Sequence, residues 1–199
     1  MQFIGTTRDE LKDILVAITV LTVAFLLLDI VSYGRSSFVD YFWVFLSGAL
    51  LAVLTAFLLH ELAHRYTARR FGQHAFFKLW PLGALLALVT SLFGIIFAAP
   101  GAVYYSGYAS NREMNGKISL AGPATNVIIG SAMAIAGLQI AASGAGLILI
   151  QVARLNFWFG LFNMIPIWQL DGAKVLAWNH EVFLVIIAVA LFGTVLLPY

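Results

Sequence analysis

Apolar residues run along this chain in long blocks that short polar or glycine-containing turns separate. Five blocks are clear: residues 14–33, 38–66, 118–142, 147–168 and 182–197. A helix that crosses a bilayer needs about 20 mostly apolar residues, so each block is predicted to cross a membrane. The pattern therefore predicts an all-α membrane protein, a polytopic helical bundle of five to six transmembrane helices.

One further apolar stretch, residues 82–99, does not suit a plain crossing helix. Small, polar or helix-breaking residues interrupt it or follow it directly: Gly83, Thr90, Ser91, Gly94 and Pro100. Apolar length alone would allow an ordinary transmembrane helix here. The interruptions instead allow a membrane-embedded hairpin, which could be strand-like or broken-helical.

Composition supports the membrane assignment and excludes other classes. Hydrophobic residues make up 62% of the 199 residues and charged residues only 10%, against about 25% charged in a soluble domain. The chain is predicted to be one domain, 1–199, embedded in a lipid bilayer. The net charge of +2 does not indicate a nucleic-acid partner, and the sequence leaves the oligomeric state open. The N-terminus lacks the basic start of a cleaved signal peptide, so we expect a retained first helix.

Two histidines and a glutamate stand at the end of the second apolar block. His60 and His64 are four residues apart and share one helix face, so they can bind one metal ion. Glu61 projects about 100° from His60, beside the metal but off the ligand direction. Such an HExxH pattern is typical of zinc hydrolases, with the glutamate as general base. Ionisable groups in a membrane-spanning segment cost roughly 2.5–3.5 kcal/mol each, which favours a functional site over a pair of interfacial histidines.

A catalytic zinc ion usually has three protein ligands and one open position. The chain has no cysteine, so thiolate ligands are excluded. The third ligand must be another histidine or a carboxylate, and the candidates are Asp171, His74, His180, Glu181, Asp29 and Asp40.

Three motifs together resemble the site-2 proteases, a family of intramembrane zinc metalloproteases. They are HELAH at residues 60–64, AGPATN at residues 121–126 and NMIPIWQLDG at residues 163–172. Their order and spacing agree with the family, and the resemblance covers roughly residues 50–174. Ala63, where the family often has glycine, and Ala173-Lys174, where it often has Gly-Arg, are departures that touch no ligand. No PDZ or CBS domain is present, so the chain resembles a minimal catalytic core.

The resemblance implies a role for each matching residue. It implies one Zn²⁺ ion bound by His60, His64 and Asp171, with Glu61 as the general base toward a zinc-activated water. Asn163 would stabilise the oxyanion or position the substrate. Asn126 would lie near the site, either pairing with substrate backbone or joining helices through a hydrogen bond. The implied reaction is hydrolysis of a peptide bond in or near a transmembrane segment of a substrate protein, as in regulated intramembrane proteolysis.

Charge and ligand geometry together predict the topology. Basic residues follow the second block (Arg65, Arg69, Arg70 and Lys78), so by the positive-inside rule that end is cytoplasmic. Asp171 can reach His60 only if the block at 147–168 also runs from outside to inside. Residues 82–99 then make no net crossing and form a re-entrant hairpin, whose unpaired edge could bind an extended substrate. We expect a multi-pass protein of a prokaryotic cell membrane, with the active site toward the cytoplasm.

Two other functions fit parts of the pattern. A metal-ion transporter would use intramembrane histidine and aspartate as a transit site, but it has no need of Glu61 as a base. An inactive homologue would act as a membrane binding protein, although its ligand and base residues are intact.

Overall fold

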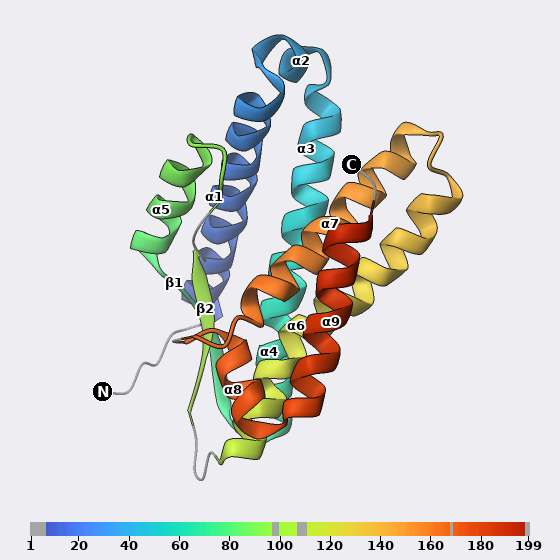
Figure 1. Cartoon of the computed structure of the whole chain (residues 1–199). Coiled ribbons are helices and arrows are strands. Elements are labelled where there is room, and N and C mark those ends of the chain that lie inside the picture. The colour runs from blue at the N-terminus through green and yellow to red at the C-terminus, as the bar shows by residue number, and fades with distance from the viewer. Residues whose placement is uncertain (1–6, 97–99, 107–110, 168, 198–199) are drawn as a thin grey trace. The chain divides into compact units, whose positions relative to one another are not determined.

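The computed structural model describes residues 7–96, 100–106, 111–167 and 169–197. Within these residues the chain is helical apart from two short strands (Figure 1). The elements in order are α1 Thr7–Tyr33, α2 Arg35–Asp40, α3 Phe42–Ala52, the π-helical turn η1 Val53–Leu58, α4 Leu59–Arg70, β1 His74–Leu79, α5 Pro81–Ser91, β2 Gly101–Ser106, α6 Arg112–Gln139, α7 Gly144–Asn163, α8 Asp171–Trp178 and α9 His180–Leu196. The prediction of an all-α membrane protein is confirmed.

The chain divides into two compact units. The first comprises residues 1–53 and 76–104, and the second comprises residues 54–75 and 105–199. Each unit contains residues from distant parts of the chain, so neither corresponds to one continuous stretch of sequence.

In the first unit, α1 packs against α3 and α5. Small and branched side chains fill the contact, because Ala17, Ala24 and Ala87 are fully buried and Leu21 nearly so. Helix α5 begins with Pro81 at its first turn, where a missing N–H costs nothing. Its 11 residues extend about 16 Å, roughly half the thickness of the apolar core of a bilayer.

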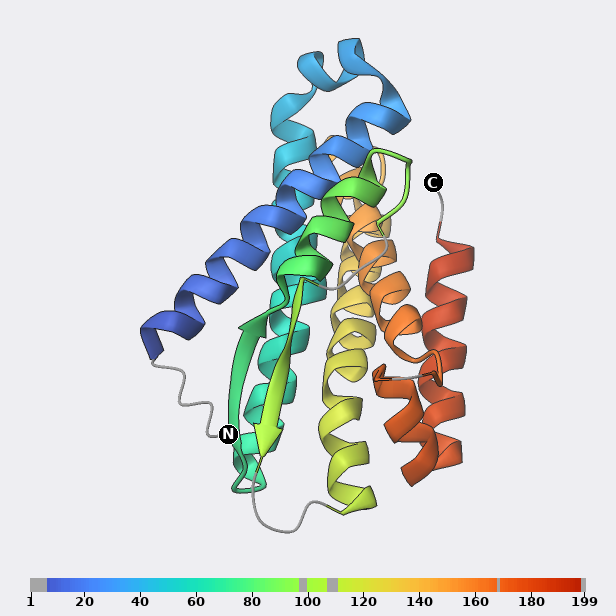
Figure 2. The same cartoon turned by 90° about the vertical axis from the view of Figure 1, so that its left-hand side faces the viewer.

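The strands β1 and β2 pair into a two-stranded sheet and run antiparallel (Figure 2). The amide of Trp80, directly after β1, donates to the carbonyl of Pro100, directly before β2, at 2.7 Å. Amides of β1 that point the other way bond to carboxylates of α1. Phe77 donates to Glu10 Oε1 at 2.9 Å and Leu79 donates to Asp13 Oδ2 at 3.1 Å. The first turns of α1 therefore cap the outer edge of β1.

In the second unit, α6 lies against α4, α7 and α8, and α9 lies against α7. Glycines allow these helices to approach closely. A methyl group on Gly130 would lie 3.2 Å from the carbonyl oxygen of Ala153 on α7. A methyl group on Gly193 of α9 would clash with the ring of Phe157 on α7.

Several helices begin before the apolar blocks that predicted them. Helix α6 starts at Arg112 rather than at residue 118, because the side chain of Asn111 caps it by accepting from the amide of Met114 at 2.8 Å. Helix α7 starts at Gly144 rather than at residue 147, and Ser143, predicted to belong to a turn, is its cap. Asn179 caps α9 in the same way. These polar caps supply acceptors for otherwise unpaired amides, a contribution that hydropathy does not measure.

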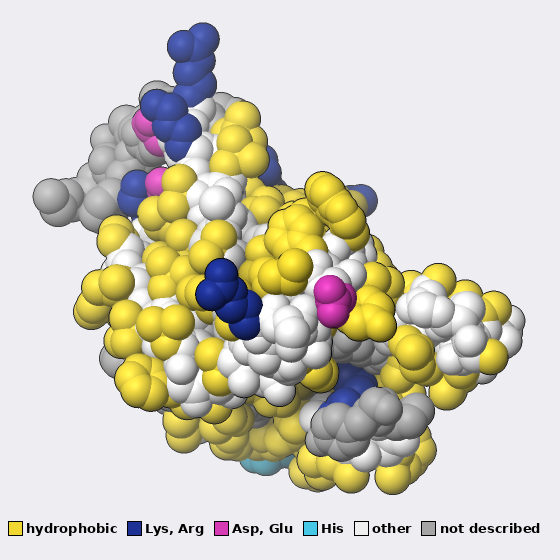
Figure 3. All heavy atoms as spheres, turned by 90° about the horizontal axis from the view of Figure 1, so that it is seen from above, with side chains coloured by type: hydrophobic (Ala, Val, Ile, Leu, Met, Phe, Trp, Pro, Cys, Tyr) yellow, Lys and Arg dark blue, Asp and Glu magenta, His cyan; other side chains and the backbone are white. Residues whose placement is uncertain are grey.

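Among the described residues, four helices are long and apolar enough to cross a membrane: Arg8–Tyr33, Phe42–Arg70, Arg112–Gln139 and Gly144–Asn163. Helix α9, with 17 residues, is shorter. Large apolar side chains stand exposed along these helices, among them Val16, Leu50, Ile128 and Leu147. Apolar side chains also dominate the face seen in Figure 3. The protein is therefore a multi-pass membrane protein.

In the predicted re-entrant segment, residues 82–99, the first part is helical and belongs to α5, which ends at Ser91. After α5 the backbone turns at Gly94, whose φ of 82° favours glycine. Positions 97–99 lie outside the described residues, as does Trp168 at the end of the block predicted at 147–168.

Candidate metal centre

Helix α4 buries the three ionisable residues of the HExxH motif in the second unit. His60, Glu61 and His64 are all buried, with exposed fractions of 2%, 8% and 7%. The helix enters this region through the π-helical turn η1, which directly precedes it. Short π-helical turns often occur at functional sites, because they disturb the regular pattern of backbone hydrogen bonds.

Asp171 comes to the two histidines from a different part of the chain. It is the first residue of α8 and follows Leu170, which has extended backbone. The next residue, Gly172, lies so close to the carbonyl of Met164 that a methyl group there would overlap it. This close approach folds the loop after α7 back on itself and carries Asp171 to α4.

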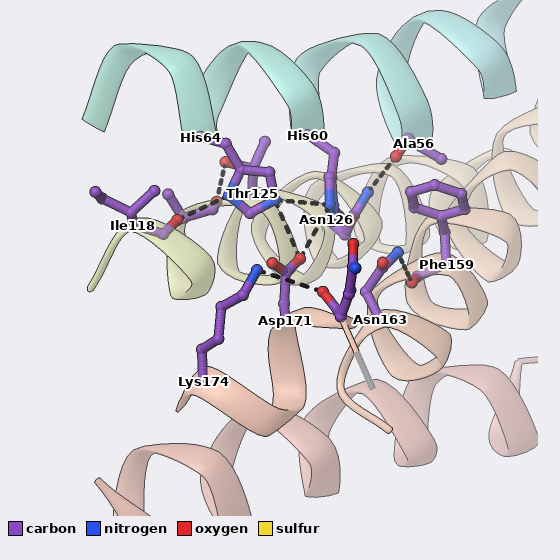
Figure 4. A network of polar contacts seen from close by, with 12 residues as sticks. Ala56, His60, His64, Ile118, Thr125, Asn126, Phe159, Asn163, Asp171 and Lys174 are labelled. Atoms are coloured by element: carbon purple, nitrogen blue, oxygen red, sulfur yellow. Dashed lines mark hydrogen bonds and ion pairs between the residues drawn. The ribbon is translucent and has the colours of Figure 1, made fainter. Parts of the chain in front are cut away.

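Three side-chain atoms converge at this point (Figure 4). His60 Nε2 and His64 Nε2 are 3.0 Å apart. Asp171 Oδ2 lies 3.4 Å from His60 Nε2 and 3.1 Å from His64 Nε2. Among the described residues, His60, His64 and Asp171 form the group of histidines and carboxylates that could hold a metal ion. The other third-ligand candidates, His74, His180, Glu181, Asp29 and Asp40, do not join it.

The spacing fits a tetrahedral zinc ion. Zinc bonds of about 2.0–2.1 Å to nitrogen and oxygen place neighbouring ligand atoms of a tetrahedron about 3.3 Å apart. The three measured separations lie around this value. Gly122 of α6 leaves room at the same point, because a methyl group there would clash with His64 Nε2 and lie 2.6 Å from His60 Nε2.

Each imidazole is oriented through its second nitrogen. His64 Nδ1 lies 2.7 Å from the carbonyl of Ile118, and His60 Nδ1 lies 2.6 Å from Asn126 Oδ1. A carbonyl oxygen only accepts, so Nδ1 is the donor in both rings, and each Nε2 keeps its lone pair for a metal. The ring of Phe159 packs edge-on against that of His60, with centroids 5.1 Å apart.

Charge at the site also suits a divalent cation. Asp171 is a buried carboxylate whose Oδ2 lies within 3.4 Å of both Nε2 atoms, where it can complete the ligand set of a cation. Glu61 is a second buried carboxylate within the electrostatic reach of His64. Two buried negative charges are costly without a cation to balance them, and a zinc ion would supply that balance.

The two asparagines of the sequence motifs lie near this centre. Asn163, at the end of α7, donates from Nδ2 to the carbonyl of Phe159 at 2.9 Å. Figure 4 shows it on the side of Asp171 and His60. Asn126 is fully buried, and its Nδ2 donates to the carbonyl of Ala56 at 2.9 Å. It thus joins α6 to the helix that carries the histidines.

The sequence patterns did not predict Thr55, Ala56 and Asn156, which lie behind His60. Asn156 Oδ1 accepts from Asn126 at 3.3 Å, and Asn156 Nδ2 donates to Thr55 Oγ1 at 2.9 Å. One signal for Asn156 was present, because it is one of the few polar residues within a mostly apolar span.

Comparison with known proteins gives several relatives. A protein of Methanocaldococcus jannaschii named as a zinc metalloprotease, MJ0611, is 40% identical over 190 residues, which cover 94% of this chain and 93% of the relative. YwhC of Bacillus subtilis, also named as a zinc metalloprotease, is 30% identical over 64% of this chain and 66% of its own length. Rip3 of Mycobacterium tuberculosis carries the same kind of name and is 29% identical over 67% of this chain, but the match spans only 31% of Rip3. No protein-family model and no solved structure matches the chain.

Proposed function

Because the chain belongs to the site-2 protease family of zinc metalloproteases, we propose that it hydrolyses a peptide bond in or near a transmembrane segment of a membrane-protein substrate. The observation that carries the proposal is the convergence of His60, His64 and Asp171, with the buried carboxylate of Glu61 beside them. This site belongs to a chain whose apolar helices are long enough to cross a membrane, so a substrate must reach it from the bilayer or its surface.

His60, His64 and Asp171 hold the zinc ion in this proposal. When bound, zinc polarises the scissile carbonyl and lowers the pKa of water at the site. Glu61 takes the proton of the attacking water and passes it to the leaving amine. Its position one residue after His60 supports this role, since it projects about 100° away from the ligand direction.

Asn163 is the proposed donor to the developing oxyanion. Its amide nitrogen carries two hydrogens, and the bond to Phe159 uses one of them. A neutral, fixed donor stabilises charge that develops in the transition state. For Asn126 the geometry favours a positioning role over contact with substrate backbone, because its side-chain oxygen and nitrogen both have protein partners.

We further propose that residues 82–99 are re-entrant. His64 of α4 contacts Ile118 in the second turn of α6, so the end of α4 and the start of α6 lie on the same side of the second unit. Helix α5 is too short to cross a bilayer. With the basic residues at the end of α4 on the cytoplasmic side, the active site faces the cytoplasm. In this proposal an extended substrate binds along β2, on the side of the strand pair opposite to the carboxylates of α1.

Cleavage of a transmembrane substrate by the purified protein tests the reaction. We expect Glu61→Gln to lower the cleavage rate by about 10²–10⁴-fold, the range for a general base, while zinc content stays stoichiometric. Unchanged cleavage in this variant would exclude Glu61 as the base. Zinc retained without cleavage in the unmodified protein, together with zinc flux into vesicles, would favour the metal-ion transporter instead.

Single cysteines test the topology, since the natural chain has none. Arg112→Cys, at the first residue of α6, is expected to react with a membrane-impermeant thiol reagent only after the cytoplasmic side is made accessible by permeabilising the cells. Ser36→Cys and Ala142→Cys are expected to react in intact cells. Labelling of Arg112→Cys from outside would contradict the re-entrant segment or the orientation.

A further inference from the structure

A chain of buried amides extends from the metal centre into the second unit. It begins at His60 and continues through Asn126 of α6 and Asn156 of α7 to Thr55 in the π-helical turn. Asn126 and Asn156 are both fully buried, and Thr55 is 8% exposed. Polar groups within apolar spans are costly, and none of these three side chains is a candidate metal ligand.

Two backbone carbonyls fix the direction of every bond in this chain. Asn156 Nδ2 faces the carbonyl of Val152 at 2.9 Å, and Asn126 Nδ2 faces that of Ala56 at 2.9 Å. A carbonyl cannot donate, so neither amide can rotate by 180° without placing two acceptors together. Asn156 Oδ1 therefore accepts from Asn126, and Asn126 Oδ1 accepts from His60 Nδ1.

The π-helical turn supplies two of the acceptors in this arrangement. Thr55 and Ala56 lie within Val53–Leu58. Backbone carbonyls in such a turn depart from the regular bonding of an α-helix, and the carbonyl of Ala56 accepts from the side chain of Asn126. The turn that precedes the HExxH motif thus also holds the group behind its first histidine.

We propose that Asn156 and Thr55 are positioning residues for the metal centre, acting through Asn126 to hold His60 in the tautomer that leaves Nε2 free for zinc. The inference rests on the metal site of the proposed function. Loss of an outer hydrogen-bond partner of a metal ligand typically lowers metal affinity by about 10–100-fold. Asn156 is one bond further away, so the lower end of that range applies.

Zinc affinity of the purified full-length protein, measured by competition with a chromogenic chelator, tests this inference without any cleavage assay. Asn156→Leu is expected to weaken zinc binding about tenfold. Thr55→Val removes the hydroxyl at nearly constant shape and is expected to weaken it less, whereas Thr55→Ser restores the acceptor and the affinity. Thr125→Val is the matched control, because the Thr125 hydroxyl donates to Ala121 of its own helix at 2.8 Å.

The outcomes separate the inference from the proposed function. If the unmodified protein binds no zinc, the proposed function itself fails. If the unmodified protein binds zinc and folded Asn156→Leu and Thr55→Val bind it equally well, the positioning role is excluded. Should Asn156→Leu fail to fold, the comparison of Thr55→Val with Thr55→Ser decides alone, and equal affinities in that pair overturn the inference.

Discussion

Polar side chains perform two different tasks in the two units of this protein. In the second unit, the polar groups around His60 are buried, and each bond of the chain from His60 to Asn156 has one defined direction. In the first unit, Glu10 and Asp13 hold the amides of β1. Asp13 also pairs with Lys78, whose side chain is half exposed, at 3.0 Å.

The difference lies in what happens when one partner is removed. A buried polar group that loses its hydrogen-bond partner keeps the full free-energy cost of desolvation. If the group orients a metal ligand, its loss also weakens binding of the ion. Glu10 in the first unit is buried as well, but its partner is an amide of β1 and not a metal ligand, so the effect of losing it is confined to local stability. Substitutions among the buried groups behind His60 should therefore affect zinc, and substitutions of the carboxylates that bind β1 should affect local stability alone.

The largest effect is expected for Gly122→Ala. The added methyl group would occupy the space between the two imidazoles, so zinc binding should be lost and cleavage should disappear with it. Zinc content of the purified variant is the measurement. Gly48→Ala is the control, because a methyl group at Gly48 meets nothing within 4 Å. Stoichiometric zinc in Gly122→Ala would show that the histidines do not meet as described.

A smaller effect is expected for Glu10→Ala. The variant leaves the amide of the buried Phe77 without its acceptor, which should cost about 1–3 kcal/mol of local stability. Hydrogen exchange at the Phe77 amide should accelerate accordingly, whereas zinc affinity should not change. Glu10→Gln keeps an acceptor and should exchange more slowly than the alanine variant. A loss of zinc in Glu10→Ala would break the division between the units.

The smallest effect is expected for Glu113→Gln. Glu113 pairs with Lys117 one turn later on α6, and both side chains are largely exposed. Such a pair contributes roughly 0.3–0.5 kcal/mol, so thermal unfolding in detergent should shift little. A change in zinc affinity here would show that charge near the start of α6 reaches the metal centre through space.

The residues of the metal cluster could be predicted because each of them lies in a short sequence motif. The spacing of His60 and His64 places them on one helix face, and the Leu-Asp-Gly motif marks Asp171. The structure brings these three together. Asn126 and Asn163 also lie near the site, and their individual roles stay predictions.

The groups behind the cluster depend on contacts that sequence patterns do not encode. The contact of Asn156 with Asn126 exists only because α6 and α7 pack closely, and Ala56 participates through its backbone. Likewise, the strands at His74–Leu79 and Gly101–Ser106 flank the segment predicted to be a hairpin, while α5 lies between them. Hydropathy marked this region as unusual without distinguishing a short helix from a strand.

The π-helical turn before the HExxH motif has a consequence for insertions and deletions. A π-helical turn contains one residue more than the α-helical turn it replaces. Deletion of one residue within Val53–Leu58 would therefore restore a regular α-helix without rotating the helices on either side of it. The two histidines would then keep their direction, but the carbonyl of Ala56 would return to ordinary helical bonding. The number of residues in this turn should thus affect metal binding even when every metal ligand is kept.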